Sequence, residues 1–179
     1  VPVCHMTGAY APLDAPPGVI LGPMPWERKE PPPVIPVDAG ELQPKELAIL
    51  KACDTALRKT SPQASFIQHF WGTLPRRTVH GASSRIPISP HIANRVGHVQ
   101  GGILFGLAAA NACAAAPPSM RLSNLSACFI TPGRGSVLAI GSRLLHAGRT
   151  LAVVRTEIRN AGGERVLEAI SNHVAQKRD

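Results

Sequence analysis

The chain has 179 residues, of which 44% are hydrophobic and only 4% aromatic, and its formal net charge is +8. This length suits one domain with an extension, and the apolar content is enough for a hydrophobic core. The scarcity of aromatic rings argues against a surface built for base stacking, and the basic residues are scattered along the chain. A phosphorylated small-molecule ligand therefore fits the charge better than nucleic acid, which is the least favoured partner.

The four cysteines contain no CxxC pair, which argues against a disulfide framework and against a zinc site. The longest apolar run, residues 101–116, is too short to span a bilayer, and no secretory signal is visible. We therefore expect reduced thiols, no cofactor, no membrane span and a cytoplasmic protein. The chain starts at Val1 rather than Met, which fits processing, truncation or a piece of a longer polypeptide.

Residues 1 to about 40 are dense in proline, which disfavours helices and central strands. We expect residues 1–61 to form an extended arm or linker that carries one short amphipathic helix, ending at Lys59. The apolar face of that helix consists of Leu47, Leu50, Cys53 and Leu57. A second short helix or turn is expected from Ser65 to Trp71.

The pattern changes in residues 62–179, where we expect the main domain. A strand is predicted from Val79 to Ser89, followed by a loop and by a helix from Val99 to Ala116 that is apolar almost all round. The remaining predicted strands are Leu122–Ile130, Val137–His146, Thr150–Arg159 and Arg165–Val174. In the third of these, small and aliphatic residues alternate with charged ones, as in a strand with one buried face.

This element order predicts an α+β fold in which a curved antiparallel sheet wraps around a central buried helix, the later strands forming a meander. A helix that is apolar on nearly every face must be covered on nearly every face, and an open sheet leaves an edge strand exposed. We therefore expect a homodimer or tetramer, or a partnership with a second domain of the same kind.

The stretch from Asn94 to Gly102 leads directly into the predicted helix. Adjacent glycines at a helix N-terminus let the backbone approach a ligand, and the free N–H groups there point outward. With the positive end of the helix dipole, they can polarise a carbonyl oxygen that becomes negative in a transition state. The alternative is that Gly101 and Gly102 only allow tight packing of the helix on the sheet.

This stretch resembles the signature N-x-x-G-x-x-H-G-G of the phenylacetyl-CoA (PaaI-like) branch of hot-dog-fold acyl-CoA thioesterases. Asn94, Gly97, Gly101 and Gly102 match it at the same spacing. Further matches are the pairs Pro132-Gly133, Gly148-Arg149 and Gly162-Gly163. The resemblance covers about 110 residues from Ala64 onward. It implies the hot-dog fold and the hydrolysis of an acyl-CoA thioester to free acid and CoA, with no metal.

The resemblance also implies a mechanism, from which this sequence departs at two positions. The thioester carbonyl would bind the Gly101 N–H, and a helix carboxylate of the partner subunit would activate water or attack the carbonyl. The family's histidine is replaced by Gln100, which can hydrogen-bond but cannot titrate. The helix carboxylate would fall at residue 109, where this sequence has Ala109.

The candidate catalytic residues are therefore Gly101, with Gln100 and Asn94 to orient substrate or water, and His98 as a candidate base. A lone loop histidine is more often structural than catalytic. The candidate substrate-binding residues are Gly102 and Asn111, with Arg134, Arg143 and Arg149 for the CoA phosphates. The acyl specificity would depend on the packing of Phe105, Leu107 and Phe129 across a dimer interface.

Three explanations remain open for the missing carboxylate. Water held by the amide side chains and His98 could suffice, or the acid could come from another chain or from a preceding hot-dog domain in a tandem protein. In the third explanation, the chain is a non-catalytic acyl-CoA-binding subunit. We favour hydrolysis. A hot-dog dehydratase or hydratase is less favoured because it needs an acid near the helix, and no acidic residue occurs between Asp54 and Glu157.

Overall fold

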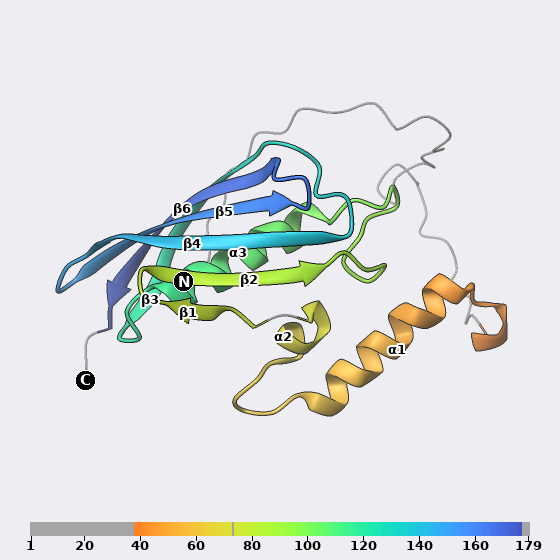
Figure 1. Ribbon diagram of the computed structural model, residues 1–179. Helices are drawn as coiled ribbons and strands as arrows, with labels where there is room; N and C mark the ends of the chain where they lie inside the picture. Colours follow the sequence, from red (N-terminus) through yellow and green to blue (C-terminus); the bar gives the residue numbers. More distant parts are fainter. Residues whose placement is uncertain (1–37, 73, 177–179) are drawn as a thin grey trace, which may run out of the picture. The chain divides into compact units, whose positions relative to one another are not determined.

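The computed structural model describes residues 38–72 and 74–176 (Figure 1), and these belong to one compact unit. Most of the proline-rich arm expected from the sequence falls on residues 1–37, outside the described part. The expected domain boundary near residue 61 stays a prediction.

The two N-terminal helices follow the sequence closely. Helix α1, Pro44–Lys59, has proline at its first position, and the backbone N–H of Gln43 donates to the Glu46 carboxylate at 2.8 Å. Helix α2, Phe66–Trp71, ends at Gly72, whose φ of 72° lies in the left-handed region that favours glycine. The two helices pack against each other. The leucines on α1 are exposed at Leu47, Leu50 and Leu57.

The sheet has six strands, one more than expected. In chain order they are β1 (Arg76–Thr78), β2 (Gly81–Pro87), β3 (Met120–Phe129), β4 (Val137–Ala147), β5 (Leu151–Asn160) and β6 (Arg165–Ala175). The spatial order is β1-β2-β4-β5-β6-β3, and every pairing is antiparallel. The predicted meander holds for β4, β5 and β6. It is wrong for β3, which pairs with β6 and forms an edge of the sheet.

Helix α3, Gly101–Ala115, lies along the inner face of this sheet (Figure 1). It packs with the inward-facing strand residues in one hydrophobic cluster, whose fully buried members include Ile86, Leu138, Ile140, Ile158 and Leu167. The alternation predicted for β5 is confirmed, because Ala152, Val154 and Ile158 are fully buried and the charged residues face outward.

A single chain covers only part of α3, and the expected cover by a second copy or domain stays a prediction. Its buried residues are Leu104, Leu107, Ala108, Asn111, Ala112 and Ala115. Gly102, Ala110 and Cys113 remain exposed. The sheet thus covers one side of the helix, and part of the other side is open.

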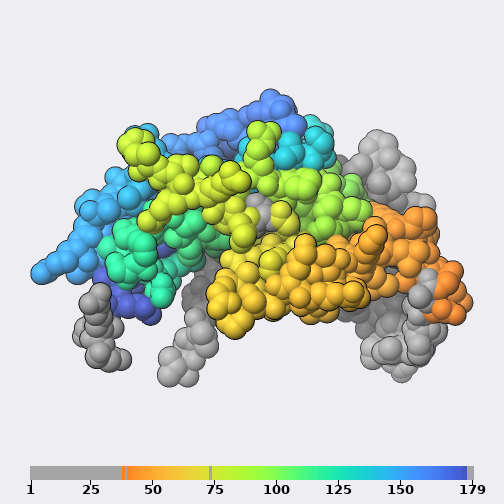
Figure 2. Space-filling view, turned by 60° about the horizontal axis from the view of Figure 1, so that its bottom comes forward, coloured from red at the N-terminus to blue at the C-terminus, as the bar shows by residue number. Residues whose placement is uncertain are grey.

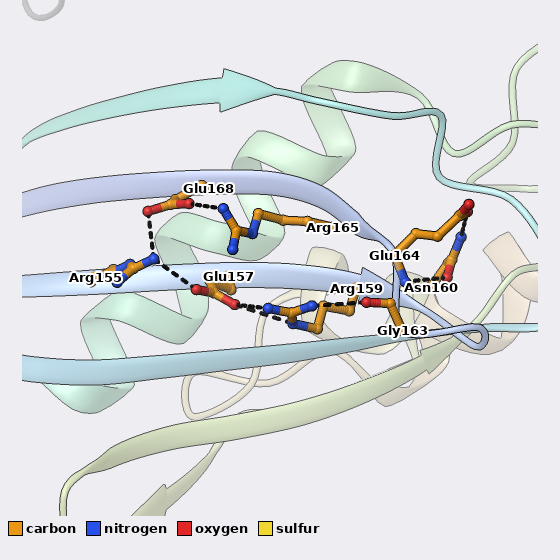
Figure 3. A network of polar contacts seen from close by, with 8 residues as sticks. All are labelled: Arg155, Glu157, Arg159, Asn160, Gly163, Glu164, Arg165 and Glu168. Carbon is orange, nitrogen blue, oxygen red and sulfur yellow. Dashed lines mark hydrogen bonds and ion pairs between the residues drawn. The ribbon is translucent and has the colours of Figure 1, made fainter.

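The outer face of β5 and β6 carries a network of charged residues (Figure 3). Glu157 and Glu168 lie directly opposite each other, and the Arg155 guanidinium bonds to both carboxylates, at 2.9 and 2.8 Å. Burial alone would raise the pKa of Glu157, but its hydrogen bond to Arg159 and the nearby arginine charges outweigh this and hold the pKa below its usual value. The arginines thus allow two carboxylates to face each other across neighbouring strands.

Candidate functional site

The N-terminal end of α3 presents unbonded backbone donors. Gln100 caps the helix, since its side-chain Oε1 accepts the Ile103 N–H at 3.2 Å, and its own backbone N–H donates to the Ile92 carbonyl at 3.0 Å. The N–H groups of Gly101 and Gly102 have no acceptor among the described residues, and both glycines are exposed. These donors sit at the positive end of the helix dipole, where negative charge is stabilised.

The loop before α3 is a tight turn built by the residues of the signature. The Asn94 side-chain Oδ1 accepts the backbone N–H groups of Val96 and His98 at 3.1 and 3.0 Å. Gly97 has a φ of 81°, which favours glycine over residues with a Cβ. The spacing from Asn94 to Gly97 therefore serves the turn that leads into the helix. The half-buried His98 lies on this turn, two residues before the helix cap.

Arg134 lies at the same end of the molecule as this turn. The Val99 N–H donates to the Gly133 carbonyl at 2.8 Å, which joins the residues before Arg134 to the start of α3. Gly133 is buried, and an added Cβ there would come within 3.2 Å of the Val99 Cβ. The Arg134 guanidinium is 4.0 Å from the Glu164 carboxylate, and both side chains are more than half exposed, so the pairing is weak.

Arg143 and Arg149 lie away from this end. Strand β4 begins at Val137, near the Gly133 contact with the loop, and runs to Ala147 over a length of about 30 Å. Arg143 is more than halfway along it, and Arg149 lies in the turn beyond it, at the opposite end from the start of α3 (Figure 1). The structure therefore does not bring these two arginines together with Gly101 in one chain.

Asn111 is fully buried inside a polar network rather than facing a ligand. Its Oδ1 accepts the Ser84 hydroxyl at 2.9 Å, and its Nδ2 donates to the Ala82 carbonyl at 3.2 Å and to the Ser142 Oγ at 3.0 Å. The Ser142 hydroxyl continues to the Thr156 hydroxyl at 2.6 Å. Because both ends of the amide are occupied, we assign Asn111 a structural role and leave it out of the binding site proposed below.

Two aromatic side chains stand beside α3. A Cβ added at Gly101 would lie 3.6 Å from Phe129 Cε1, so this ring borders the exposed helix start. Trp71 packs so closely on Gly106 that an added Cβ there would overlap the indole. Neither Trp71 nor Gly106 was expected at the site. The available signal was a single glycine inside an alanine-rich helix, which often marks a close approach.

The described residues contain no group of three or more His, Cys, Asp or Glu side chains that could hold a metal ion. Within the same part of the chain, no helix is long and apolar enough to cross a membrane. The described cysteines, Cys53, Cys113 and Cys128, are free thiols.

Comparison with known proteins gives a family match for part of the chain and a fold for the domain. Residues 90–173 match the family described as the acyl-CoA thioesterase N-terminal domain. No curated protein sequence matches the chain significantly. A Bacillus halodurans protein solved with CoA is 20% identical, with a TM-score of 0.66 over 78% of this chain and 98% of that one.

Other solved structures have a similar fold. A Streptococcus pneumoniae hypothetical thioesterase with coenzyme A is 20% identical, with a TM-score of 0.55 over 60% of this chain and 88% of that one. A conserved Pseudomonas aeruginosa protein is 24% identical, with a TM-score of 0.55 over 67% of this chain and 98% of that one. The chain has the hot-dog fold of these structures, and its residues 90–173 match the acyl-CoA thioesterase domain family.

Proposed function

We propose that the chain hydrolyses an acyl-CoA thioester to the free acid and CoA, at the N-terminal end of α3. The observation that carries this proposal is the pair of exposed, unbonded N–H groups of Gly101 and Gly102 at the start of α3. The match of residues 90–173 to an acyl-CoA thioesterase domain, and the similar structures solved with CoA, support it.

The thioester carbonyl oxygen accepts the Gly101 N–H, and the helix dipole adds to the stabilisation when that oxygen becomes negative. Gln100 uses its Oε1 to cap the helix, so its Nε2 is the part of the amide that can donate to substrate or water. Water attacks the carbonyl carbon, the C–S bond breaks, and the CoA thiolate leaves and takes up a proton. Asn94 holds the turn that fixes Gln100 and Gly101 in place.

The proton of the attacking water needs an acceptor that α3 does not provide. The helix contains no Asp or Glu, and residue 109 is an alanine. His98, two residues before the cap, is the candidate in this chain. A carboxylate of a second chain or domain is the alternative. Thiol release by a His98→Gln variant separates the two, because kcat falls only if His98 is the base.

We propose that the protein works as a homodimer or tetramer in the cytoplasm, within the PaaI-like branch. The exposed side of α3 and the edge strand β3, which pairs only with β6 among the described strands, support assembly with a second copy. A second copy would also be needed to bring Arg143 or Arg149 to the CoA phosphates. The free thiols fit a reducing compartment.

The second candidate function is binding of acyl-CoA without hydrolysis, which the lack of a helix carboxylate favours. Thiol release by the purified chain, at a measured oligomeric state, decides between them with short, long and aryl acyl-CoAs. Turnover that collapses in Gln100→Ala supports a thioesterase that works without the helix carboxylate. No turnover, with CoA esters still raising the melting temperature, supports the binding subunit or one half of a split site.

A further inference from the structure

An open hollow of about 380 Å³ lies between helices α1 and α2 and the turn that follows β2. None of the residues that line it belongs to α3. Figure 2 shows the face of the molecule on which α1, in orange, lies beside the yellow residues of α2. The hollow is therefore distinct from the start of α3, and the function proposed above does not use it.

The walls of this hollow are mostly apolar and partly aromatic. The apolar side chains that line it are those of Ala48, Ala52, Phe70, Trp71 and Pro87. The Phe70 ring stacks on the Phe66 ring at 5.1 Å between centroids, and its centroid lies 4.8 Å from that of the His91 imidazole. Because flat rings form this part of the wall, it suits the face or edge of another ring.

The polar side chains of the hollow are basic or neutral, and no Asp or Glu lines it. These side chains are Lys51, Thr55, His69, Ser89 and His91. The Lys51 ammonium forms no ion pair within the described part of the chain. The acid on the next turn of α1, Asp54, pairs instead with Arg58 at 2.6 Å. The hollow therefore carries a positive charge that no carboxylate of this chain offsets, which favours an anionic ligand.

The two histidines of the hollow differ in their hydrogen bonds. The Ser89 hydroxyl lies 3.3 Å from His91 Nε2, and the Ile92 N–H donates to the Ser89 carbonyl at 3.1 Å, which closes a turn that contains Pro90. His69 Nε2, in contrast, is buried and has no hydrogen-bond partner among the described residues. A buried polar atom without a partner costs free energy, and a ligand oxygen that accepts from a ring N–H there removes this cost.

We propose that this hollow binds an aromatic monocarboxylate, with its ring against Phe70 and Trp71 and its carboxylate at Lys51 and His69. One water molecule occupies about 30 Å³ in the liquid, so the hollow has room for roughly a dozen non-hydrogen atoms. A carboxylate suits it better than a phosphate group, because the hollow offers one permanent positive charge and mostly apolar walls. This site goes beyond the proposed function and does not depend on it.

Naphthalene-2-carboxylate is the probe, because it has this size and its own fluorescence reports binding to the full chain. Its uncharged amide tests the need for the charge, and competition by acetate and by inorganic phosphate tests whether an anion without the ring is enough. Lys51→Met and His69→Phe remove the proposed partners of the carboxylate. Lys45→Met, on the same helix but outside the hollow, is the matched control for Lys51→Met, and melting temperatures check folding. His69→Phe should not lower the melting temperature, because it removes a buried nitrogen that has no partner.

We expect saturable binding of the carboxylate, and binding of the amide that is weaker by about tenfold or more. Lys51→Met should weaken binding of the carboxylate by about fivefold, as on loss of a partly exposed ion pair, and His69→Phe by about tenfold or more, because its hydrogen bond is buried. Lys45→Met should leave the affinity unchanged. Absence of binding, equal affinity for acid and amide, displacement by acetate or phosphate at equal concentration, or equal effects of the two lysine variants would overturn the assignment. None of these outcomes depends on thiol release, so they leave the proposed hydrolysis to its own test.

Discussion

The two ends of α3 are treated differently by the rest of the fold. At the C-terminal end, the Arg77 guanidinium donates to the carbonyls of Ala114 at 3.0 Å and Ala115 at 3.4 Å, and also to that of Ala116. At the N-terminal end, the Gly101 and Gly102 N–H groups have no acceptor in the described part of the chain. The fold thus satisfies the acceptors at one end and leaves donors at the other, where a ligand can use them.

Substitution of Asn111 should have the largest effect on stability. Asn111→Ala removes the partner of Ser84, of Ser142 and of the Ala82 carbonyl in a fully buried site, and should lower the free energy of unfolding by about 2–4 kcal/mol. Urea unfolding measures it. Asn124→Ala, at an exposed asparagine on β3, is the control and should stay within about 0.5 kcal/mol of the wild type. Similar losses in both variants would show that the network does not anchor α3.

Substitution of Arg77 should show that the C-terminal end of α3 contributes to stability and not to catalysis. Arg77→Met leaves the last carbonyls of α3 without their donor and should lower the free energy of unfolding by about 1 kcal/mol, without changing kcat. Arg76→Met, at the exposed neighbouring arginine on β1, controls for loss of one positive charge and should have a smaller effect. A fall in kcat with Arg77→Met alone would contradict the division of roles.

A buried histidine on β6 makes the stability of the fold sensitive to pH. His173 lies on β6 close to the pairing of Met120 with Ala175, and it is fully buried with its Nε2 3.0 Å from the Ser171 hydroxyl. Burial lowers the pKa of His173. The unfolded state therefore takes up a proton first as the pH falls, and stability is lost below about pH 6.5, down through the folded-state pKa.

His173→Gln removes this titration and should flatten the dependence of the free energy of unfolding on pH between about 7 and 5. Urea unfolding at several pH values gives the comparison. An equally steep decline in the variant would mean that other groups dominate in this range. The effect of His173→Gln on stability should be smaller than the effects of Asn111→Ala and Arg77→Met.

Much of the fold could be predicted from the sequence because it follows from local patterns. The alternation in β5 and the apolar run of α3 indicated the type of each element, and a loop was expected before α3. The pairing of β3 with β6 could not be predicted from the sequence. Local patterns indicate where strands lie, but they do not indicate that β3 pairs with β6 rather than with β4, the next strand along the chain. Strand β1 was missed because three exposed residues carry no alternation.

The site was predicted only in part, for the same reason. Gly101 and Gly102 stand at the helix start as expected, because glycines next to an apolar run mark that position. The contacts of Asn111, Arg77 and Trp71 join residues about 30 or more positions apart, and no local pattern records them. The sequence therefore predicted that Asn111 could bind a ligand, whereas in the structure its side chain bonds to residues of the sheet.

The Gly101 N–H can be tested most directly with one pair of variants. Gly101→Pro removes the N–H at the first helical position, where proline is well tolerated, and the preceding Gln100 already has the extended backbone that proline requires (φ −64°, ψ 136°). Gly101→Ala keeps the N–H, and its Cβ would make an ordinary contact with Phe129 at 3.6 Å. Both variants should fold with nearly wild-type melting temperatures.

The measurement is kcat for thiol release by the two variants. We expect Gly101→Pro to lose about 10²–10³-fold, as on removal of one donor to a developing oxyanion, and Gly101→Ala to stay close to the wild type. A folded Gly101→Pro enzyme with the kcat of Gly101→Ala would contradict the account, because the Gly101 N–H would then play no part in the reaction.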